Sequence, residues 1–170
     1  MSSIICCFII ALIAAADQLI KYAVLNSSLV VLADGEIKEG SIITVIDKFL
    51  QLDYEPNTGA AFSILEDKTE FLAVFSAVVL LIGFYLIFAR KIKSKVLLVS
   101  VVMIMGGGLG NLIDRVWHHF VIDYIRVLFI DFPVFNFADC FVTVGEFILI
   151  GYLLWDIIRD LKKGKVRKNG

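Results

Sequence analysis

Hydrophobic residues along this chain gather into long runs that are separated by polar segments. Two of these runs, Phe71–Ala89 and Val96–Ile113, contain no charged residue. Each is close to the roughly 20 residues that an α-helix needs to cross the hydrocarbon core of a bilayer. Two further runs, Ile4–Leu25 and Cys140–Trp155, carry only a few charged residues. The pattern therefore predicts four transmembrane helices.

The four runs divide the chain into spans and connecting segments. We expect spans at approximately 4–25, 71–89, 96–114 and 139–157, in a single integral-membrane domain of residues 1–170. Met-Ser-Ser at the N-terminus lacks the basic region of a cleaved signal peptide, so the first run is predicted to be a retained helix. The connecting segments are 26–70, 90–95, 115–138 and 158–170.

Basic residues mark the orientation of these helices. Four lie in the short connection RKIKSK at 90–95, and six lie in the tail that begins at Arg159. Lys and Arg are enriched in cytoplasmic connections of membrane proteins. We therefore expect both termini and 90–95 to be cytoplasmic, and 26–70 and 115–138 to be extracytoplasmic.

The first outer segment has a pattern of its own. EIKEGSIITVIDKFLQLDYEP alternates loosely, is rich in β-branched and aromatic residues, and is punctuated by Gly35 and Gly40, which predicts two or three short strands. Open sheet edges do not occur in lipid, so this sheet should lie outside the membrane or against the helices. The predicted fold is a mainly α membrane protein with four transmembrane helices, a small extracytoplasmic β-sheet between helices 1 and 2, and an extracytoplasmic loop between helices 3 and 4.

Composition agrees with a membrane protein. Of 170 residues, 59% are hydrophobic and 19% charged, which is too apolar for an ordinary soluble domain. The three cysteines lack the spacing of a metal site or a disulfide. His118 and His119 are adjacent, so they face different ways and have no third ligand at useful spacing. We expect no metal, no cofactor and no nucleic-acid partner.

Polar residues form four clusters at or beyond the outer ends of the helices. These clusters are DQLIK (17–21), NTGAAFS (57–63), GGGLGNLIDR (106–115) and the stretch that holds Asp123, Asn136 and Asp139. A desolvated carboxylate costs several kcal/mol unless it is paired or protonated. Clustering on one side of the membrane predicts a shared site at the outer interface.

Some of these residues also have a purely structural interpretation. Asp17 and Lys21 share a helix face and could form an anchoring ion pair. Asp139 could simply cap the fourth helix. The glycines at 106–110 are compatible with ordinary helix packing in membranes.

Two other groups are more informative. Asn111, Asp114 and Arg115 could be a solvated helix end, or they could hold other carboxylates in place. Asp123 alternates with large apolar residues, which predicts an extended segment with one polar contact.

Asp123 and Asp139 together indicate a chemistry. They lie sixteen residues apart with Pro133 between them, so only tertiary structure could unite them. Two carboxyl groups in close contact share one proton, which leaves one as base and the other as acid. Such a pair could activate water for peptide hydrolysis. Asp131 precedes Phe-Pro and is predicted to be a solvated turn residue outside the site.

Other peptidase mechanisms lack their motifs. The sequence contains neither HExxH nor GxSxG. Gly108-Leu109-Gly110 is followed by Asn111, which departs from the GxGD motif of presenilin-like proteases. Two alternatives from other classes stay open: a small ion-coupled membrane carrier with intramembrane acidic residues, and a structural membrane subunit whose polar clusters bind a partner.

The polar blocks resemble the signature blocks of the bacterial lipoprotein signal peptidase family, the type II signal peptidases. DQLIK, NTGAAFS, GGGLGNLIDR, VIDYI and FPVFNFADC occur in the same order and at similar spacing over nearly the whole chain. The resemblance implies an aspartic endopeptidase that removes the signal peptide from diacylglyceryl-modified prolipoproteins, on the N-terminal side of the lipidated cysteine. It implies that Asp123 and Asp139 are the catalytic pair. Positions that the family uses around this pair are Asp17, Lys21, Asn57, Gly59, Asn111, Asp114, Arg115 and Asn136.

The resemblance also implies a setting and partners. It places the protein in the bacterial cytoplasmic membrane, with the active site near the outer leaflet. Prolipoproteins and membrane phospholipid are the implied partners, globomycin-type cyclic peptides are implied inhibitors, and we expect a monomer.

The chain departs from the family pattern at several positions. Cys140 stands where Ser or Thr is usual, Tyr124 where Phe or Met is usual, and His118-His119 where a Gly is common. Glu146 is unusual in the fourth helix, where it shares a face with Asp139. We expect Glu146 to face the interior of the helix bundle, protonated or hydrogen-bonded; a role in tuning the carboxyl pair is the alternative.

Overall fold

The structure is a computed structural model that describes residues 2–33, 36–59 and 68–168. Four long helices fall in these ranges: α1 (Ser3–Leu25), α2 (Thr69–Phe88), α3 (Lys95–Trp117) and α4 (Phe137–Lys168). Each contains a stretch long and apolar enough to cross a membrane. The predicted four-helix membrane fold is therefore confirmed.

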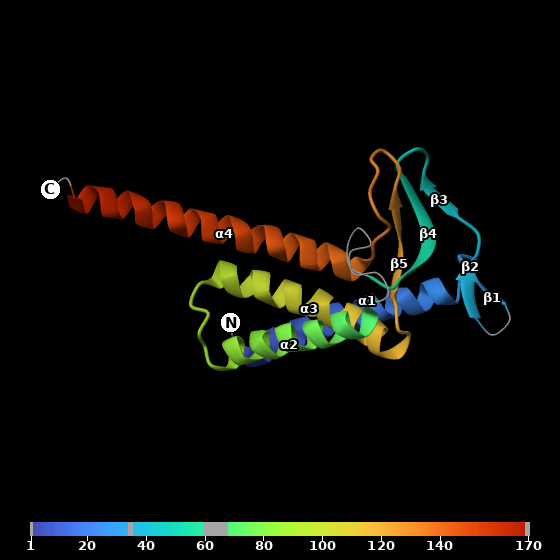
Figure 1. The fold of residues 1–170 in the computed structure, drawn as a ribbon, viewed down its shortest axis with the longest axis horizontal. Helices are drawn as coiled ribbons and strands as arrows, with labels where there is room; N and C mark the ends of the chain where they lie inside the picture. The colour runs from blue at the N-terminus through green and yellow to red at the C-terminus, as the bar shows by residue number, and fades with distance from the viewer. Residues whose placement is uncertain (1, 34–35, 60–67, 169–170) are drawn as a thin grey trace.

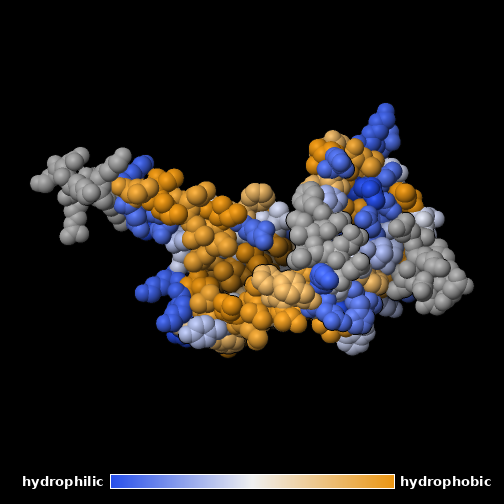
Figure 2. Space-filling model, in the orientation of Figure 1, coloured by the Kyte–Doolittle hydropathy of each residue, from blue (hydrophilic) through white to orange (hydrophobic). Residues whose placement is uncertain are grey.

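The helices lie side by side, with the strands gathered at one end (Figure 1). Helix α4 runs along the others and then extends beyond them. The N-terminus, the α2–α3 connection and the end of α4 lie at the opposite end from the strands. Apolar side chains cover most of the helical surface, and hydrophilic residues gather toward the ends (Figure 2).

The strands form two small antiparallel sheets. Strands β1 (Val30–Ala33) and β2 (Glu36–Glu39) pair with each other. A three-stranded sheet has the order β3-β4-β5, built from β3 (Ile43–Ile46), β4 (Leu50–Asn57) and β5 (Val121–Val127). The predicted sheet between helices 1 and 2 is confirmed. The stretch 36–56 contains β2, β3 and most of β4, within the two or three strands expected there, and β1 precedes that stretch.

Strand β5 comes from the segment between helices 3 and 4, which was expected to be a loop. It pairs antiparallel with β4, and Asp123 lies opposite Glu55 in the register. The extended conformation predicted around Asp123 is therefore present. Its pairing joins the two outer segments into one unit.

Two apolar clusters hold the fold together. One lies among α1, α2 and α3 and includes Ile10, Leu80 and Met105. The other joins the end of α1 to the sheet and includes Val24, Tyr54 and Ile122. The second cluster fixes β5 against the helices, and so fixes where the side chain of Asp123 can reach.

Glycines in α3 permit close approaches. A Cβ on Gly107 would collide with the backbone carbonyl of Ala138 in α4, and a Cβ on Gly110 would collide with the carboxylate of Asp17 in α1. Small residues let helix backbones approach closely in membranes. Here these contacts bring the start of α4 and the polar end of α1 onto the same region of α3.

Candidate active site

Asp123 is buried on β5, with each carboxylate oxygen held by a different amide. Asn136 donates from Nδ2 to Oδ1 at 2.6 Å, and Asn57 donates from Nδ2 to Oδ2 at 2.9 Å. The amide of Asn57 is itself oriented, because its Oδ1 accepts a hydrogen bond from the Gly59 N–H at 2.9 Å. The position of Asp123 is therefore set by β4, β5 and the residue preceding α4.

Asp139 lies in the first turn of α4, in a capping box with Asn136. Asn136 Oδ1 accepts from the Asp139 N–H at 2.9 Å, and Asp139 Oδ2 accepts from the Asn136 N–H at 3.1 Å. This reciprocal arrangement satisfies backbone donors that a helix start leaves free. The other oxygen, Oδ1, accepts from Asn111 Nδ2 at 2.7 Å. The expected helix-capping role of Asp139 and a role in a polar site are thus compatible.

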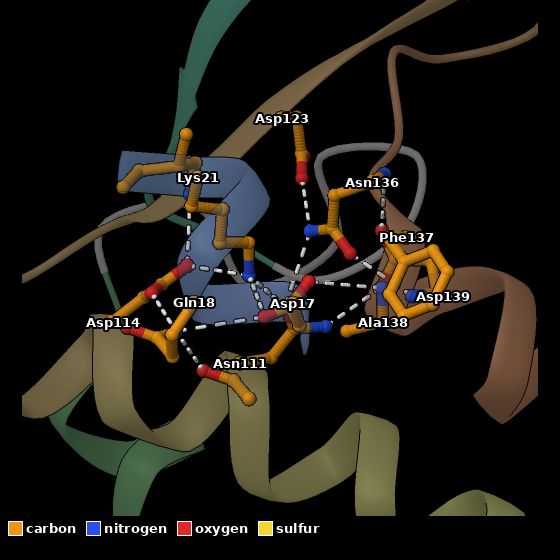
Figure 3. Close-up of polar contacts among 12 residues, drawn as sticks. Asp17, Gln18, Lys21, Asn111, Asp114, Asp123, Asn136, Phe137, Ala138 and Asp139 are labelled. Carbon is orange, nitrogen blue, oxygen red and sulfur yellow. Dashed lines mark hydrogen bonds and ion pairs between the residues drawn. The ribbon is translucent and has the colours of Figure 1, made fainter. Parts of the chain in front are cut away.

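Asn136 links the two carboxylates. It is fully buried; its side-chain Nδ2 donates to the carboxylate of Asp123, and its backbone N–H donates to the carboxylate of Asp139. Its Nδ2 also lies 3.1 Å from Asn111 Oδ1. Figure 3 shows Asn136 between the strand that holds Asp123 and the start of α4.

A buried ion cluster contacts Asn111, one of the amides that hold the carboxyl groups. Lys21 Nζ lies 2.8 Å from Asp17 Oδ2 and 2.7 Å from Asp114 Oδ2, and it donates to Asn111 Oδ1 at 2.9 Å. Figure 3 shows Lys21 joined by dashed lines to both carboxylates. All three ionic side chains are at most 1% exposed. Since Asn111 receives its hydrogen bond from Lys21 through Oδ1, its Nδ2 is free to face Asp139. The predicted pairing of Asp17 with Lys21 is present.

Asp17 and Asp114 also hold backbone groups of the neighbouring elements. Asp17 Oδ1 accepts from the Ala138 N–H at 3.1 Å in the first turn of α4. Asp114 Oδ2 accepts from the Ile122 N–H at 3.2 Å on β5. The cluster therefore fixes the two backbone segments that carry Asp139 and Asp123.

Arg115 connects α3 to the segment after β4. Its guanidinium donates to the Gly59 carbonyl at 3.0 Å, and its Nε is buried with no partner among the residues described. The predicted residues Asn57, Gly59 and Arg115 thus lie together beside Asp123.

A cleft of about 700 Å³ opens over the two carboxyl groups. Asp123, Asp139 and Arg115 line it, together with apolar residues that include Pro133 and Val142. Asp131 is exposed and does not line the cleft in the part of the chain described, consistent with its exclusion from the site. All ten residues predicted for the site are in this network or at its edge.

The electrostatics of Asp123 favour its protonated form. Burial, and next the nearby charge of Asp139, raise the pKa of Asp123 to about 7, although hydrogen bonds from Asn57 and Asn136 oppose the shift. A negative charge close to a buried carboxyl group raises its proton affinity, so Asp123 binds a proton near neutral pH more readily than an ordinary carboxyl group. A protonated Asp123 is a hydrogen-bond donor and a general acid.

Glu146 does not face the bundle interior, so that expectation is wrong. Its side chain is exposed and lines the same cleft as Asp139. The helical period correctly put both residues on one face of α4. Helix α4 packs on α3 through a neighbouring side, where Ala138 meets Gly107 and Gly145 meets Ile104, and this packing leaves the face that carries Glu146 turned toward the cleft.

Two further residues take part that the sequence did not single out for the site. Gln18 Nε2 donates to Asp114 Oδ1 at 2.8 Å and to the Gly110 carbonyl at 3.1 Å. Tyr124 accepts a hydrogen bond from the Phe137 N–H at 3.3 Å through its hydroxyl. Burial raises the pKa of Tyr124 above its ordinary value, so this phenol stays protonated. Gln18 lies within the DQLIK block, which was its only signal.

Comparisons with known proteins agree with one another. The family model described as Signal peptidase (SPase) II matches residues 9–155. The lipoprotein signal peptidase of Enterococcus faecalis is 38% identical over 94% of this chain and 91% of its own length. That of Streptococcus pneumoniae is 36% identical over 84% of this chain and 87% of its own. A solved bacterial membrane enzyme has a TM-score of 0.77 and 30% identity, covering 89% of this chain and 88% of its own.

Proposed function

The chain belongs to the signal peptidase II family of aspartic peptidases, and we propose that Asp123 and Asp139 are the dyad with which it cleaves diacylglyceryl-prolipoproteins. Membership of this family makes it a bacterial multi-pass membrane protein with lipoprotein signal peptidase activity. The proposal concerns the residues that carry the reaction and the bond that they cut.

One observation carries the assignment of the dyad. Asn136 donates a hydrogen bond to each of the two carboxyl groups that line a single cleft, although they come from a strand and a helix. Among the residues described, no other pair of carboxyl groups that line this cleft shares a hydrogen-bond partner in this way. Asp17 and Asp114, by contrast, are fully buried and engaged by Lys21.

The proposed reaction uses the single proton of the pair. Ionised Asp139 takes a proton from a water molecule as the water oxygen attacks the carbonyl carbon of the scissile peptide bond. Protonated Asp123 donates a hydrogen bond to the carbonyl oxygen, where negative charge develops. Collapse of the tetrahedral intermediate breaks the C–N bond, and the leaving amine receives a proton from the dyad. The dyad thereby returns to its starting state.

The supporting residues keep the two acids different. Both acids accept two hydrogen bonds, but Asp139 lies at the start of a helix, where the macrodipole stabilises an anion. Asp123 lies on a strand and not at the start of a helix, and it has a pKa of about 7. This difference supports Asp139 as the base and Asp123 as the acid.

The cleft suits a substrate that remains in the membrane. It begins at the strands and continues along α4 to Thr143 and Glu146, about two helical turns below Asp139. We propose that the diacylglyceryl chains stay in the bilayer while the peptide bond before the lipidated cysteine reaches the dyad. In this arrangement, both termini and the α2–α3 connection are cytoplasmic and the sheets are extracytoplasmic. We also expect a monomer that globomycin-type cyclic peptides inhibit.

The test uses purified enzyme and a diacylglyceryl-prolipoprotein, with mass spectrometry of the released signal peptide. Asp123→Asn and Asp139→Asn should each reduce cleavage by at least about 10²- to 10⁴-fold, because each removes a proton-transfer group. Asp131→Asn is the matched control and should retain activity, since Asp131 is exposed. Full activity in both dyad variants would overturn the mechanism. An equal rate on unlipidated precursor would overturn the lipid requirement.

A further inference from the structure

A second cavity lies at the opposite end of the helices from the carboxyl dyad. Its volume is about 360 Å³, and it is enclosed by the start of α1, the end of α2 and the α2–α3 connection. Ser3 in this cavity and Lys21 beside the dyad lie on the same helix, about 27 Å apart at the usual helical rise. The cavity is thus separate from the proposed active site.

Cationic side chains surround this cavity. Arg90, Lys93 and Lys95 line it, and all three are exposed. The sequence has no Asp or Glu in residues 1–16 or 71–113, which supply every segment that encloses the cavity. These cations therefore lack local carboxylates to neutralise them.

The backbone adds positive potential in the same place. Ser2 caps α1 by accepting from the Ile5 N–H, and Ser94 caps α3 by accepting from the Leu97 N–H. Neither helix has an acidic residue in its first turn. Both helix N-termini thus direct the positive ends of their dipoles toward the cavity that Ser2 and Ser94 line.

The remaining wall is apolar. Cys6, Leu86 and Leu98 line the cavity on the side of the helix bundle, and Ile92 lies between the basic residues of the connection. Figure 2 shows hydrophilic residues at this end of the helices directly beside the apolar surface. A ligand that fits must combine an anionic group with an apolar part.

We propose that this cavity is a binding site for an anionic phospholipid of the cytoplasmic leaflet. The phosphate lies among Arg90, Lys93 and Lys95, and the acyl chains follow the apolar wall into the bilayer. Basic pockets between transmembrane helices on the cytoplasmic side are suited to lipid head groups. Free inorganic phosphate shares the charge but would leave the apolar wall unused.

Bound lipid would connect parts of the fold that otherwise share few contacts. Within the described residues at this end, Ser3 Oγ to the Ile87 carbonyl, at 3.3 Å, is the side-chain hydrogen bond that links α1 to α2. A phosphate held by the connection and the start of α1 would add a second link. We therefore expect the lipid to raise the thermal stability of the full-length protein.

The test compares phosphatidylglycerol with phosphatidylcholine, added in mixed micelles to purified full-length protein. Binding is read by native mass spectrometry and by the shift in Tm. Phosphatidylglycerol should bind and raise Tm, and Lys93→Gln/Lys95→Gln should weaken that binding by about tenfold or more. The matched control is Lys91→Gln/Lys162→Gln, which removes the same charge from exposed residues that do not line the cavity. It should bind like the unchanged protein.

Further arms distinguish the alternatives. Lys93→Arg/Lys95→Arg keeps the charge and should keep the binding, and all variants should still cleave prolipoprotein, which reports a correct fold. Equal binding of the two lipids, or equal loss in the control variant, would overturn the proposal. An equal Tm increase from inorganic phosphate alone would make the cavity a phosphate site and would also overturn it.

Discussion

Asn136 and Asp139 donate a backbone N–H to each other's side chain across the first turn of α4. This capping box is a local device for starting a helix. Here it also fixes the orientation of the Asp139 carboxyl group. The side-chain Nδ2 of Asn136, which the capping box does not use, donates to Asp123 Oδ1 at 2.6 Å. The start of α4 and the geometry of the dyad are therefore one structural feature.

Variants of Asn136 should separate capping from the dyad geometry. Asn136→Ser keeps a capping oxygen but removes the Nδ2 donor to Asp123, so unfolding free energy should change by less than about 1 kcal/mol. Cleavage should fall about a hundredfold, because small misplacements of reacting groups have effects of that size. Asn136→Ala should lose both the cap and the activity. Thermal unfolding and kcat/KM are the measurements, and a fully active Asn136→Ser would contradict the linkage.

Part of this arrangement could be predicted from the sequence, because it depends on local spacing. Asp17 and Lys21 are one helical turn apart, and their ion pair follows from that spacing. Asp139 follows the asparagine of a capping box by three residues, so its place at a helix start follows as well. The four helices are predicted by apolar runs of sufficient length.

The rest depends on tertiary packing. The pairing of β5 with β4 joins segments more than sixty residues apart, and nothing local marks it. Spacing showed that Asp139 and Glu146 share a face of α4 but not which way that face turns. That direction is set by the contact of α4 with Gly107 of α3, which local spacing could not reveal.

Cleavage should fall as the pH rises above about 7. The proposed acid is Asp123, whose pKa is raised to about 7 by burial and by Asp139. Loss of its proton leaves two carboxylates and no acid, so kcat/KM should drop about tenfold per pH unit on the alkaline side. A pH profile with prolipoprotein substrate measures this. A rate that stays constant to pH 9 would contradict the assignment of Asp123.

The same pKa predicts how stability depends on pH. The pKa of Asp123 is higher in the folded protein than its ordinary value of 3.8, so protonation favours the folded state. That contribution is complete below about pH 4 and is lost as the pH rises through about 7. Asp123→Asn stays neutral throughout. The Tm of this variant, relative to that of the unchanged protein, should therefore increase from pH 4 to pH 7 and stay constant above pH 7. A constant Tm difference over this range would contradict the raised pKa.

Lys21 should be far more important for stability than an exposed cation that also bridges two carboxylates. Lys21→Met leaves Asp17 and Asp114 as unpaired buried carboxylates, which should cost about 3–5 kcal/mol. Arg126 also bridges two carboxylates, Asp53 and Glu55, but it is 38% exposed. Arg126→Met is therefore the control and should cost at most about 1 kcal/mol. Unfolding in detergent measures both, and similar losses would show that burial of the Lys21 cluster is not decisive.

Glu146 should affect substrate binding and not the proton chemistry. It lines the cleft but lies seven residues beyond Asp139 on α4, about 10 Å away along the axis and outside hydrogen-bond reach of the dyad. Glu146→Leu should leave kcat and the alkaline limb of the pH profile unchanged, because neither carboxyl of the dyad loses a partner. It should lower KM for a diacylglyceryl substrate, since no carboxyl then has to be desolvated when acyl chains enter the cleft. Glu146→Gln, which stays polar, is the control and should keep KM close to its original value. A shift of the alkaline limb in Glu146→Leu would instead establish that Glu146 tunes the dyad.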